Sequence, residues 1–275
     1  MHVENGALRT RKSLKRNTVG MWHLANTTYS GETIRMRSAD NHVATAMVLT
    51  TVSQIWSSGS SCDIQLVFTA VEEIYQLAMA GLNLRGSIGS EDDCIIVVEA
   101  MEMVPHGSGY PSYTAGPLIK VNDGDVAYGV GANASYNLAE ARLLQGATHT
   151  RHQHAESGGY TDATSVSLLT SCPNIATLAV PCRNKHNVST SGEVVPETVS
   201  YRDVVEGIGI LKSAVLLEPV DAEGVLSIQL RSTNVAQRRR ERVRAYRHNR
   251  ARLAMGFYYP ENILHWIGMV GSRLF

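Results

Sequence analysis

Five ionisable side chains of this chain have types and positions that could bind a divalent metal ion. Glu72 and Glu73 stand together directly after an apolar run that is typical of a buried strand. Glu99 and His186 follow two further apolar runs, and Asp40 precedes a helical pattern. Carboxylates at the mouth of a buried sheet are costly without a partner cation. Oxygen and imidazole ligands together favour zinc, with cobalt or manganese as alternatives.

The elements that must position these residues follow from the hydrophobic pattern. Apolar residues at spacings of three and four predict amphipathic helices, and short apolar runs between turn residues predict strands. The expected helices cover residues 41–57, 74–82, 133–144, 162–170 and 201–217, with Gly146 placed to end the third. The expected strands cover residues 64–70, 94–98, 118–121 and 176–180.

Alternation of strands and helices predicts the α/β class, with a mainly parallel, mixed sheet and helices on both faces. In such sheets, binding sites collect at the carboxyl ends of the strands. Since Glu72, Glu73, Glu99 and His186 all follow the apolar part of an expected strand, one cleft could gather them.

Charge divides the chain unevenly. Its 275 residues have a formal net charge of zero and are 44% hydrophobic, enough for a sizeable core. Residues 231–275 contain ten Arg against Glu241 and Glu261, so the remainder is acidic. We therefore expect a basic arm or remnant of an inserted domain at 1–20, one catalytic domain at 21–220 and an Arg-rich extension at 221–275.

Cysteine usage and hydropathy indicate a cytoplasmic protein. The four cysteines, Cys62, Cys94, Cys172 and Cys182, are far apart and form no CxxC pair, as expected for reduced core thiols. No apolar run approaches the roughly 20 residues that span a bilayer, so no membrane partner is expected. The basic stretch 238–252 could bind phosphates, but it lacks aromatic residues for stacking, and a nucleic-acid partner is not favoured.

Six short motifs occur in order between about residues 20 and 217. They are Ser38-Ala39-Asp40-Asn41, Val71-Glu72-Glu73, Val98-Glu99, Gly116-Pro117, Gly159-Tyr160-Thr161-Asp162-Ala163 and Pro181-Cys182-Arg183-Asn184-Lys185-His186. In their order and spacing the chain resembles the dinuclear zinc or cobalt aminopeptidases of the glutamyl and deblocking type, which form tetrahedral assemblies. The resemblance implies a three-layer zinc-exopeptidase-like fold and a homo-oligomer that acts on peptides.

The resemblance also implies a role for each candidate residue. Asp40 would bridge two metal ions, Glu73 and His186 would hold one of them, and Glu99 would help to hold the other. Glu72 would be the general base that takes a proton from the metal-bound water. Taken singly, the same residues have plainer interpretations: Asp40 as a helix cap, the glutamates as a helix N-terminus, and His186 as a loop histidine.

Two departures from the family pattern bear on the number of metal ions. Glu99 stands where the family usually has Asp. The family's remaining histidine ligand comes from an N-terminal segment that we expect this chain to lack, and neither His2 nor His23 lies in the expected motif. Asp40, Glu73 and His186 would make one three-ligand site with an open position, and the second site would be weak, so one or two ions are expected.

Three further residues are expected to support the ligands or contact the substrate. Thr161 and Asp162 open a helix, with Asp162 as its cap, and Arg183 belongs to the histidine motif. His149, His152 and His154 are interpreted as a solvated edge rather than a second metal site, since only the last two share one face of a strand.

The sequence therefore predicts a metal-dependent aminopeptidase that hydrolyses N-terminal residues from peptides. The alternative is a catalytically impaired homologue that acts as an assembly or binding subunit through its basic C-terminal segment. A third, less favoured interpretation is a nucleic-acid-associated protein that binds through the same segment.

Overall fold

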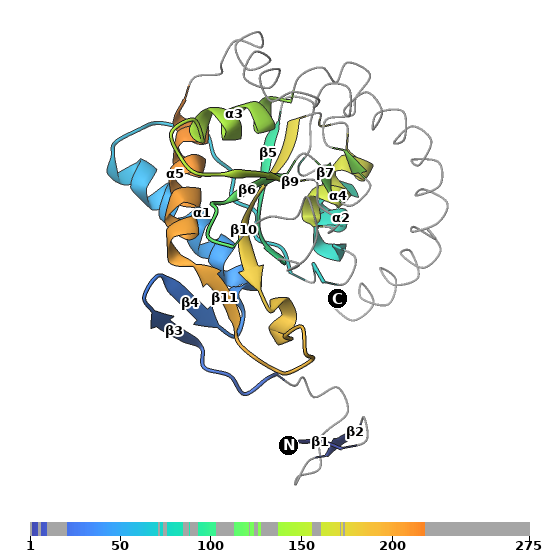
Figure 1. Ribbon diagram of the computed structural model, residues 1–275. Coiled ribbons are helices and arrows are strands. Elements are labelled where there is room, and N and C mark those ends of the chain that lie inside the picture. The colour runs from blue at the N-terminus through green and yellow to red at the C-terminus, as the bar shows by residue number, and fades with distance from the viewer. Residues whose placement is uncertain are drawn as a thin grey trace.

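The computed structural model describes residues 21–70, 72–73, 76–84, 88, 93–102, 113–120, 137–155, 161–170, 172 and 174–217, with short strands at 2–4, 7–9, 122–123 and 126–127. Helices cover both faces of one mixed sheet (Figure 1). Among these residues no helix is long and apolar enough to cross a membrane. The basic region 221–275 lies outside the described residues.

The central strand of the sheet is β10 (Asn174–Arg183). Along one side β5 (Cys94–Glu102) pairs with it in parallel, with Glu99 opposite Ala179. Along its other side β6 (Leu118–Lys120) pairs with it in antiparallel. Since β10 contacts both neighbours, it fixes the carboxyl end of β5 relative to the turn that carries His186.

The remaining strands extend the sheet from the two ends of this centre. Four pairs in the described sheet are antiparallel and two are parallel, so the expectation of a mainly parallel sheet is wrong in detail although the mixed α/β fold is confirmed. Beyond β10 lie β11 (Glu197–Ser200), β4 (Thr33–Met36) and β3 (Thr27–Ser30), in that order, and β9 (Gln153–Ala155) pairs with β6. There are also two separate two-stranded sheets among the described residues. One consists of β1 (His2–Glu4) and β2 (Ala7–Arg9), and the other of β7 (Asn122–Asp123) and β8 (Val126–Ala127).

Three helices cover one face of the sheet. They are α1 (Ala39–Ser57), α3 (Leu138–Gly146) and α5 (Tyr201–Leu216). Alternate residues of β10, such as Leu178 and Val180, are fully buried in the core that these helices share. Close packing extends to the end of α3, where a Cβ on Gly146 would lie 2.6 Å from the Ile210 carbonyl oxygen of α5. Gly146 ends the helix as expected.

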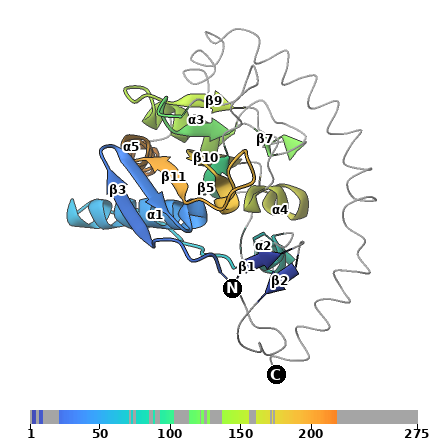
Figure 2. The same ribbon diagram turned by 60° about the horizontal axis from the view of Figure 1, so that its bottom comes forward.

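The opposite face is covered by α2 (Leu77–Leu84) and α4 (Asp162–Leu169), which lie side by side in both ribbon views (Figure 2). One residue of β10 that points this way, Ile175, packs with Val166 of α4 and Met79 of α2 in a second core. Because both faces of β10 are covered, eight of its positions are buried, which explains why its sequence is a continuous apolar run.

Most expected elements are confirmed, but one expected strand is absent from the described residues. Residues 61–69 form no regular structure and pair with no strand in the described part of the chain, so the expected strand at 64–70 is wrong. Val67 and Phe68 are 37% and 55% exposed. Burial alternates over residues 61–66, as in an extended chain, but the segment lacks the backbone partner that makes a strand.

The cysteines divide into two groups. All four are free thiols, as expected, and Cys172 and Cys182 are buried. Cys94 is exposed and Cys62 is half-buried, so the expectation that all four belong to the core is wrong. Burial raises the pKa of Cys172 to about 11, which keeps this thiol protonated and unreactive at neutral pH.

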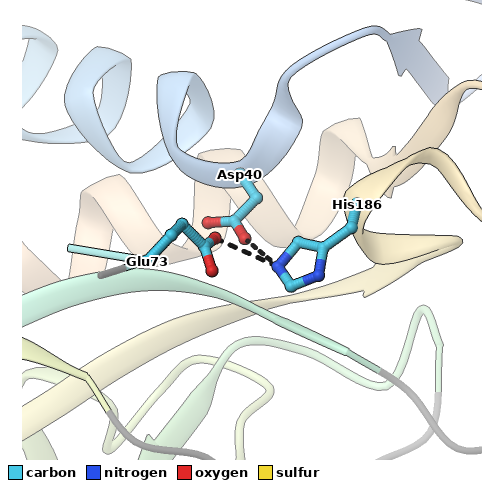
Figure 3. Close-up of side chains that lie close together, drawn as sticks. All are labelled: Asp40, Glu73 and His186. Carbon is cyan, nitrogen blue, oxygen red and sulfur yellow. Dashed lines mark hydrogen bonds and ion pairs between the residues drawn. The ribbon is translucent and has the colours of Figure 1, made fainter. Parts of the chain in front are cut away.

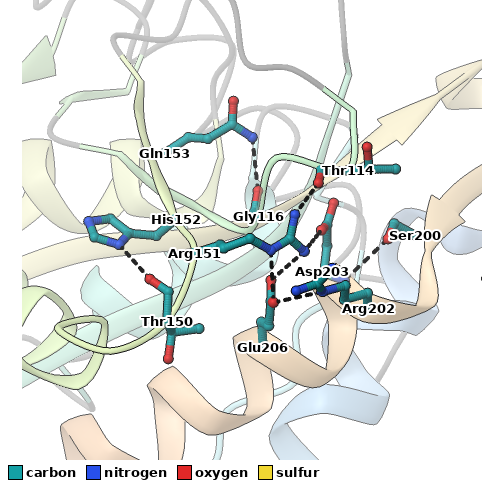
Figure 4. Close-up of polar contacts among 10 residues, drawn as sticks. All are labelled: Thr114, Gly116, Thr150, Arg151, His152, Gln153, Ser200, Arg202, Asp203 and Glu206. Atoms are coloured by element: carbon teal, nitrogen blue, oxygen red, sulfur yellow. Dashed lines mark hydrogen bonds and ion pairs between the residues drawn. The ribbon is translucent and has the colours of Figure 1, made fainter.

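The Gly116-Pro117 loop is held against α5 by Arg151. The Arg151 guanidinium pairs with Glu206 at 2.8 Å and with Asp203 at 3.4 Å, and it donates to the Thr114 carbonyl oxygen (Figure 4). Gly116 has φ of +110°, and a Cβ there would lie 2.5 Å from the Arg151 carbonyl oxygen. Only glycine fits both the backbone angle and the space. The nearby His152 Nδ1 contacts the Thr150 carbonyl oxygen at 3.0 Å.

We expect Gly116→Ala to lower the free energy of unfolding by about 3 kcal/mol, because it adds both a backbone clash and an unfavourable φ. Gly31→Ala is the matched control, since Gly31 has φ of +59° but nothing within 4 Å of the added Cβ. That control should lose only about 1 kcal/mol. Denaturant unfolding measures both values, and equal losses would contradict the close approach at Gly116.

Candidate metal centre

Asp40 lies at the start of α1 in a backbone conformation that is not yet helical. Ser38, which precedes the helix, makes no side-chain capping hydrogen bond. The Asp40 N–H donates to Glu197 Oε2 at 2.9 Å. With its side chain only 7% exposed, Asp40 presents a nearly buried carboxylate at the start of the helix.

His186 lies in the short 3₁₀ turn η1 (Lys185–Asn187) that follows β10. The backbone of this turn is unusual, because Asn184, His186 and Asn187 all have φ near +60°. Non-glycine residues adopt this conformation only where the surroundings hold them there. Here the His186 N–H donates to Glu197 Oε1 at 2.7 Å, and Asn184 Nδ2 donates to the Pro196 carbonyl oxygen at 3.2 Å.

The side chains of Asp40, Glu73 and His186 meet, although they come from three distant segments (Figure 3). His186 Nε2 lies 3.0 Å from Glu73 Oε1 and 3.6 Å from Asp40 Oδ2. One donor atom from each residue lies within 4.8 Å of the other two. Asp40 is nearly buried, whereas the Glu73 and His186 side chains are more than half exposed, so a ligand can reach the cluster from solvent.

The spacing and chemistry of this cluster fit a divalent metal ion. Two donors that each bond one tetrahedral zinc ion at about 2.1 Å lie roughly 3.4 Å from each other. The two distances from His186 Nε2, 3.0 Å and 3.6 Å, lie on either side of that value. Two carboxylates with one imidazole also form a donor set that suits zinc, cobalt or manganese.

Glu99 is buried close to the cluster but does not join it. It is 6% exposed, and its Oε2 accepts a hydrogen bond from the Ala100 N–H at 3.2 Å. Burial raises the pKa of Glu99 well above its ordinary value, and repulsion from Asp40 and Glu72 adds to the effect. Among the described residues, the single three-donor group is Asp40, Glu73 and His186, so the role of Glu99 as ligand to a second ion stays a prediction.

Glu72 is half-buried beside Glu73 and lies outside the three-donor cluster. Burial raises its pKa to about 7, and the negative charges of Glu73 and Asp162 contribute in the same direction. A carboxyl group in this environment can exchange a proton near neutral pH, which is the property that a general acid or base needs.

Lys185 is a residue of the site that sequence reasoning missed. Its Nζ lies 3.0 Å from Asp40 Oδ2, and its side chain is 21% exposed. Burial opposes the charge of this ammonium, but attraction to Asp40, Glu99 and Glu73 outweighs burial and raises the pKa of Lys185. Lys185 therefore remains charged and offsets part of the negative charge of the carboxylates. The sequence feature that could have identified Lys185 is its position directly before the expected ligand His186.

Glu197 is the second residue that was missed. It is 2% exposed on β11, and its two oxygens accept from the backbones of Asp40 and His186. Glu197 begins a short strand whose other residues are Thr198, Val199 and Ser200, and nothing in this pattern shows which distant backbone N–H groups lack partners.

Asp162 and Thr161, which were expected to support the ligands, lie at different places relative to the cluster. Asp162 Oδ2 accepts a hydrogen bond from Thr69 Oγ1 at 2.5 Å, and its charge raises the pKa of both Glu72 and Glu99, so Asp162 faces the acidic group. The cap of α4 is Thr161, whose side chain accepts from the Ala163 N–H, rather than Asp162 as expected.

Arg183 and His23 do not contribute to the cluster in the described residues. The Arg183 guanidinium lies 4.0 Å from the centre of the Tyr113 ring. This cation–π contact joins the end of β10 to the loop before β6. His23 is exposed, and Tyr160 lies outside the described residues.

The fold is shared with solved structures of aminopeptidases. Aminopeptidase APDkam598 from the archaeon Desulfurococcus kamchatkensis aligns with a TM-score of 0.56 and 21% identity, over 74% of this chain and 54% of its own. A TET aminopeptidase from the marine sediment archaeon Thaumarchaeota archaeon SCGC AB-539-E09 gives 0.55 and 14%, over 72% and 54%. The Pyrococcus horikoshii TET1 peptidase gives 0.50 and 15%, over 70% and 53%.

These likenesses establish the fold alone, since the identities are low. The chain spans about half the length of the solved structures that it matches. No family model matches the sequence, and no curated protein matches it.

We expect His186→Ala to weaken the binding of zinc by at least about 100-fold, because loss of a direct ligand should exceed the 10- to 100-fold effect of losing an outer partner. Isothermal titration of the metal-free protein with zinc measures the change. His23→Ala is the control, since His23 is exposed and lies outside the cluster. Equal zinc affinity in wild type and His186→Ala would exclude His186 as a ligand.

Proposed function

We propose that this protein is a metal-dependent aminopeptidase, with zinc as its first choice of ion and cobalt or manganese as alternatives. The observation that supports the proposal best is the meeting of Asp40, Glu73 and His186 at the spacing of donors to one ion. The fold shared with solved aminopeptidases adds support. Asp40, Glu73 and His186 would hold the ion, and Glu99 with Asp40 would hold a second ion weakly.

A bound divalent ion would lower the pKa of a water molecule toward 7 and polarise the carbonyl group of the substrate. Glu72 is adjacent to a ligand but outside the three-donor cluster, so its carboxylate can act as the general base that accepts a proton from this water. The same group then donates the proton to the departing amine.

The charge around the cluster suits a substrate with a positively charged end. Besides burial, neighbouring negative charges raise the pKa of Asp40, Glu72 and Glu99, and these charges include Glu73 and Asp162. Lys185 pairs with Asp40 in this acidic group. An acidic site of this kind attracts the free ammonium group at the N-terminus of a peptide. The charge therefore supports an exopeptidase that starts from the amino end.

The proposal extends to assembly and location. One relative of the same fold, the Pyrococcus horikoshii TET1 peptidase, can assemble into a tetrahedron or a large octahedral shell. We propose that this protein is likewise a homo-oligomer, that it works in the cytoplasm on peptides, and that neither membranes nor nucleic acids are its partners.

The direct test is hydrolysis of aminoacyl p-nitroanilides by protein loaded with zinc, cobalt or manganese. The proposal expects release of the chromophore that stops when a chelator removes the metal and returns when metal is restored. A protein that binds metal but releases no amino acid from any of a set of aminoacyl substrates would instead fit a non-catalytic homologue.

Glu72→Gln should lower kcat by about 100- to 10,000-fold, the usual contribution of a general base, and leave the zinc affinity near that of wild type. Steady-state kinetics and zinc titration measure the two quantities. Glu193→Gln, which changes an exposed glutamate in the loop after His186, should alter neither. Loss of zinc binding in Glu72→Gln would show that Glu72 is a ligand and that the roles of the pair are reversed.

A further inference from the structure

Glu197 lies between the two segments that carry Asp40 and His186. It begins β11, opposite Met36 of β4 in the sheet, and is 2% exposed. An ionised carboxylate only accepts hydrogen bonds, and both of its oxygens are used here. Carboxylates are rarely buried unless they have hydrogen-bond or ion-pair partners, so the partners of Glu197 indicate its role.

On one side Glu197 holds the start of α1. The first N–H groups of a helix have no partner within the helix, and Ser38 supplies none from its side chain. Glu197 Oε2 accepts from the Asp40 N–H at 2.9 Å. A negative charge is also favoured at this end of a helix because it faces the positive end of the helix dipole. The contact fixes the backbone from which the Asp40 side chain extends.

On the other side Glu197 holds the turn of His186. Its Oε1 accepts from the His186 N–H at 2.7 Å. His186 has φ of +60°, between Asn184 and Asn187 with similar angles, and such a conformation persists only where other contacts maintain it. The Val195 N–H also donates to the Asn187 carbonyl oxygen at 3.0 Å, so the turn is joined to the strand that carries Glu197.

We propose that Glu197 is the positioning residue of the metal centre, whose two oxygens hold the backbones of Asp40 and His186 so that both side chains reach one divalent ion. This inference rests on the proposed function. Both Glu197 oxygens bond to backbone N–H groups, and Glu197 lies outside the three-donor cluster. Its effect is transmitted through the direction of the two ligand side chains.

Glutamine cannot replace Glu197 in this role. Its amide has the same shape but only one accepting oxygen, and its NH₂ group would face one of the two backbone N–H groups. Either Asp40 or His186 would then lose its hydrogen bond and meet a second donor. The backbone at that ligand would shift, while the ligand residues themselves stay unchanged.

The experiment is a cobalt(II) titration of metal-free wild type and Glu197→Gln, followed by visible absorption and by competition with a chelator. Cobalt(II) reports its ligand geometry through its absorption bands. We expect cobalt affinity to fall by about 10- to 100-fold and the bands of saturated protein to change in position or intensity. The altered bands are a readout that a general loss of stability would not produce.

Asp203→Asn is the matched control. Asp203 is also a buried carboxylate, with 0% exposure, but its side chain pairs with Arg151, and its backbone N–H donates to Ser200 Oγ. The control should lower the thermal stability and leave the cobalt affinity within about twofold of wild type. If Asp203→Asn weakens cobalt binding as much as Glu197→Gln does, the effect is general destabilisation and the inference is overturned.

The outcomes separate this inference from the proposed function. Wild type that binds no cobalt overturns both. Wild type that binds cobalt and hydrolyses substrate, with unchanged affinity and bands in folded Glu197→Gln, overturns only the positioning role. If Glu197→Gln does not fold, Glu197→Asp takes its place: the shorter side chain keeps the charge but reaches the two amides less well, and unchanged cobalt binding in this variant also overturns the inference.

Discussion

Repulsion among buried carboxylates is the constraint on which this structure depends. Asp40 and Glu99 are almost inaccessible to solvent, and burial raises the pKa of both. Repulsion from Glu73 adds to the effect on Asp40, and repulsion from Asp40 adds to the effect on Glu99. Burial of such ionised groups without partners of opposite charge would be strongly unfavourable. Lys185 supplies one positive charge at 3.0 Å from Asp40, and the backbone N–H groups around Glu197 supply partial positive charge. A divalent cation would supply the rest.

The fold provides the frame that makes this concentration of charge possible. β10 is buried on both faces and pairs with β5 along its whole length, so the positions of Glu99 and of the turn after β10 are fixed relative to each other. α1 packs on β5 and α5, which places the start of α1 at the same edge. Rigid strands and a helix terminus therefore carry the groups that have to be placed most accurately.

The sequence predicted the three side chains that meet in the cluster, but it did not predict the residues that contact them. Asp40, Glu73 and His186 lie in short motifs with a fixed order, and their side chains do meet. Lys185 and Glu197 were missed because their roles depend on tertiary contacts with residues far away in the sequence. A local pattern contains no information on which distant amide needs an acceptor.

The errors in the fold have similar causes. The segment at 64–70 has the composition of a strand, but strands need a partner, and periodicity does not reveal one. The direction of pairing was inferred from alternation of helices and strands, which holds for β5 with β10. β11 pairs with β10 and with β4 in antiparallel instead, and the alternation of helices and strands does not reveal this direction.

We infer that Asp40, Glu73 and His186 share one metal ion. An anomalous difference map at the zinc absorption edge, from crystals of the zinc-loaded protein, tests this inference. We expect a peak about 2.1 Å from a carboxylate oxygen of Asp40, a carboxylate oxygen of Glu73 and Nε2 of His186. A zinc peak bound by other residues, or saturating zinc with no peak at this cluster, would contradict it.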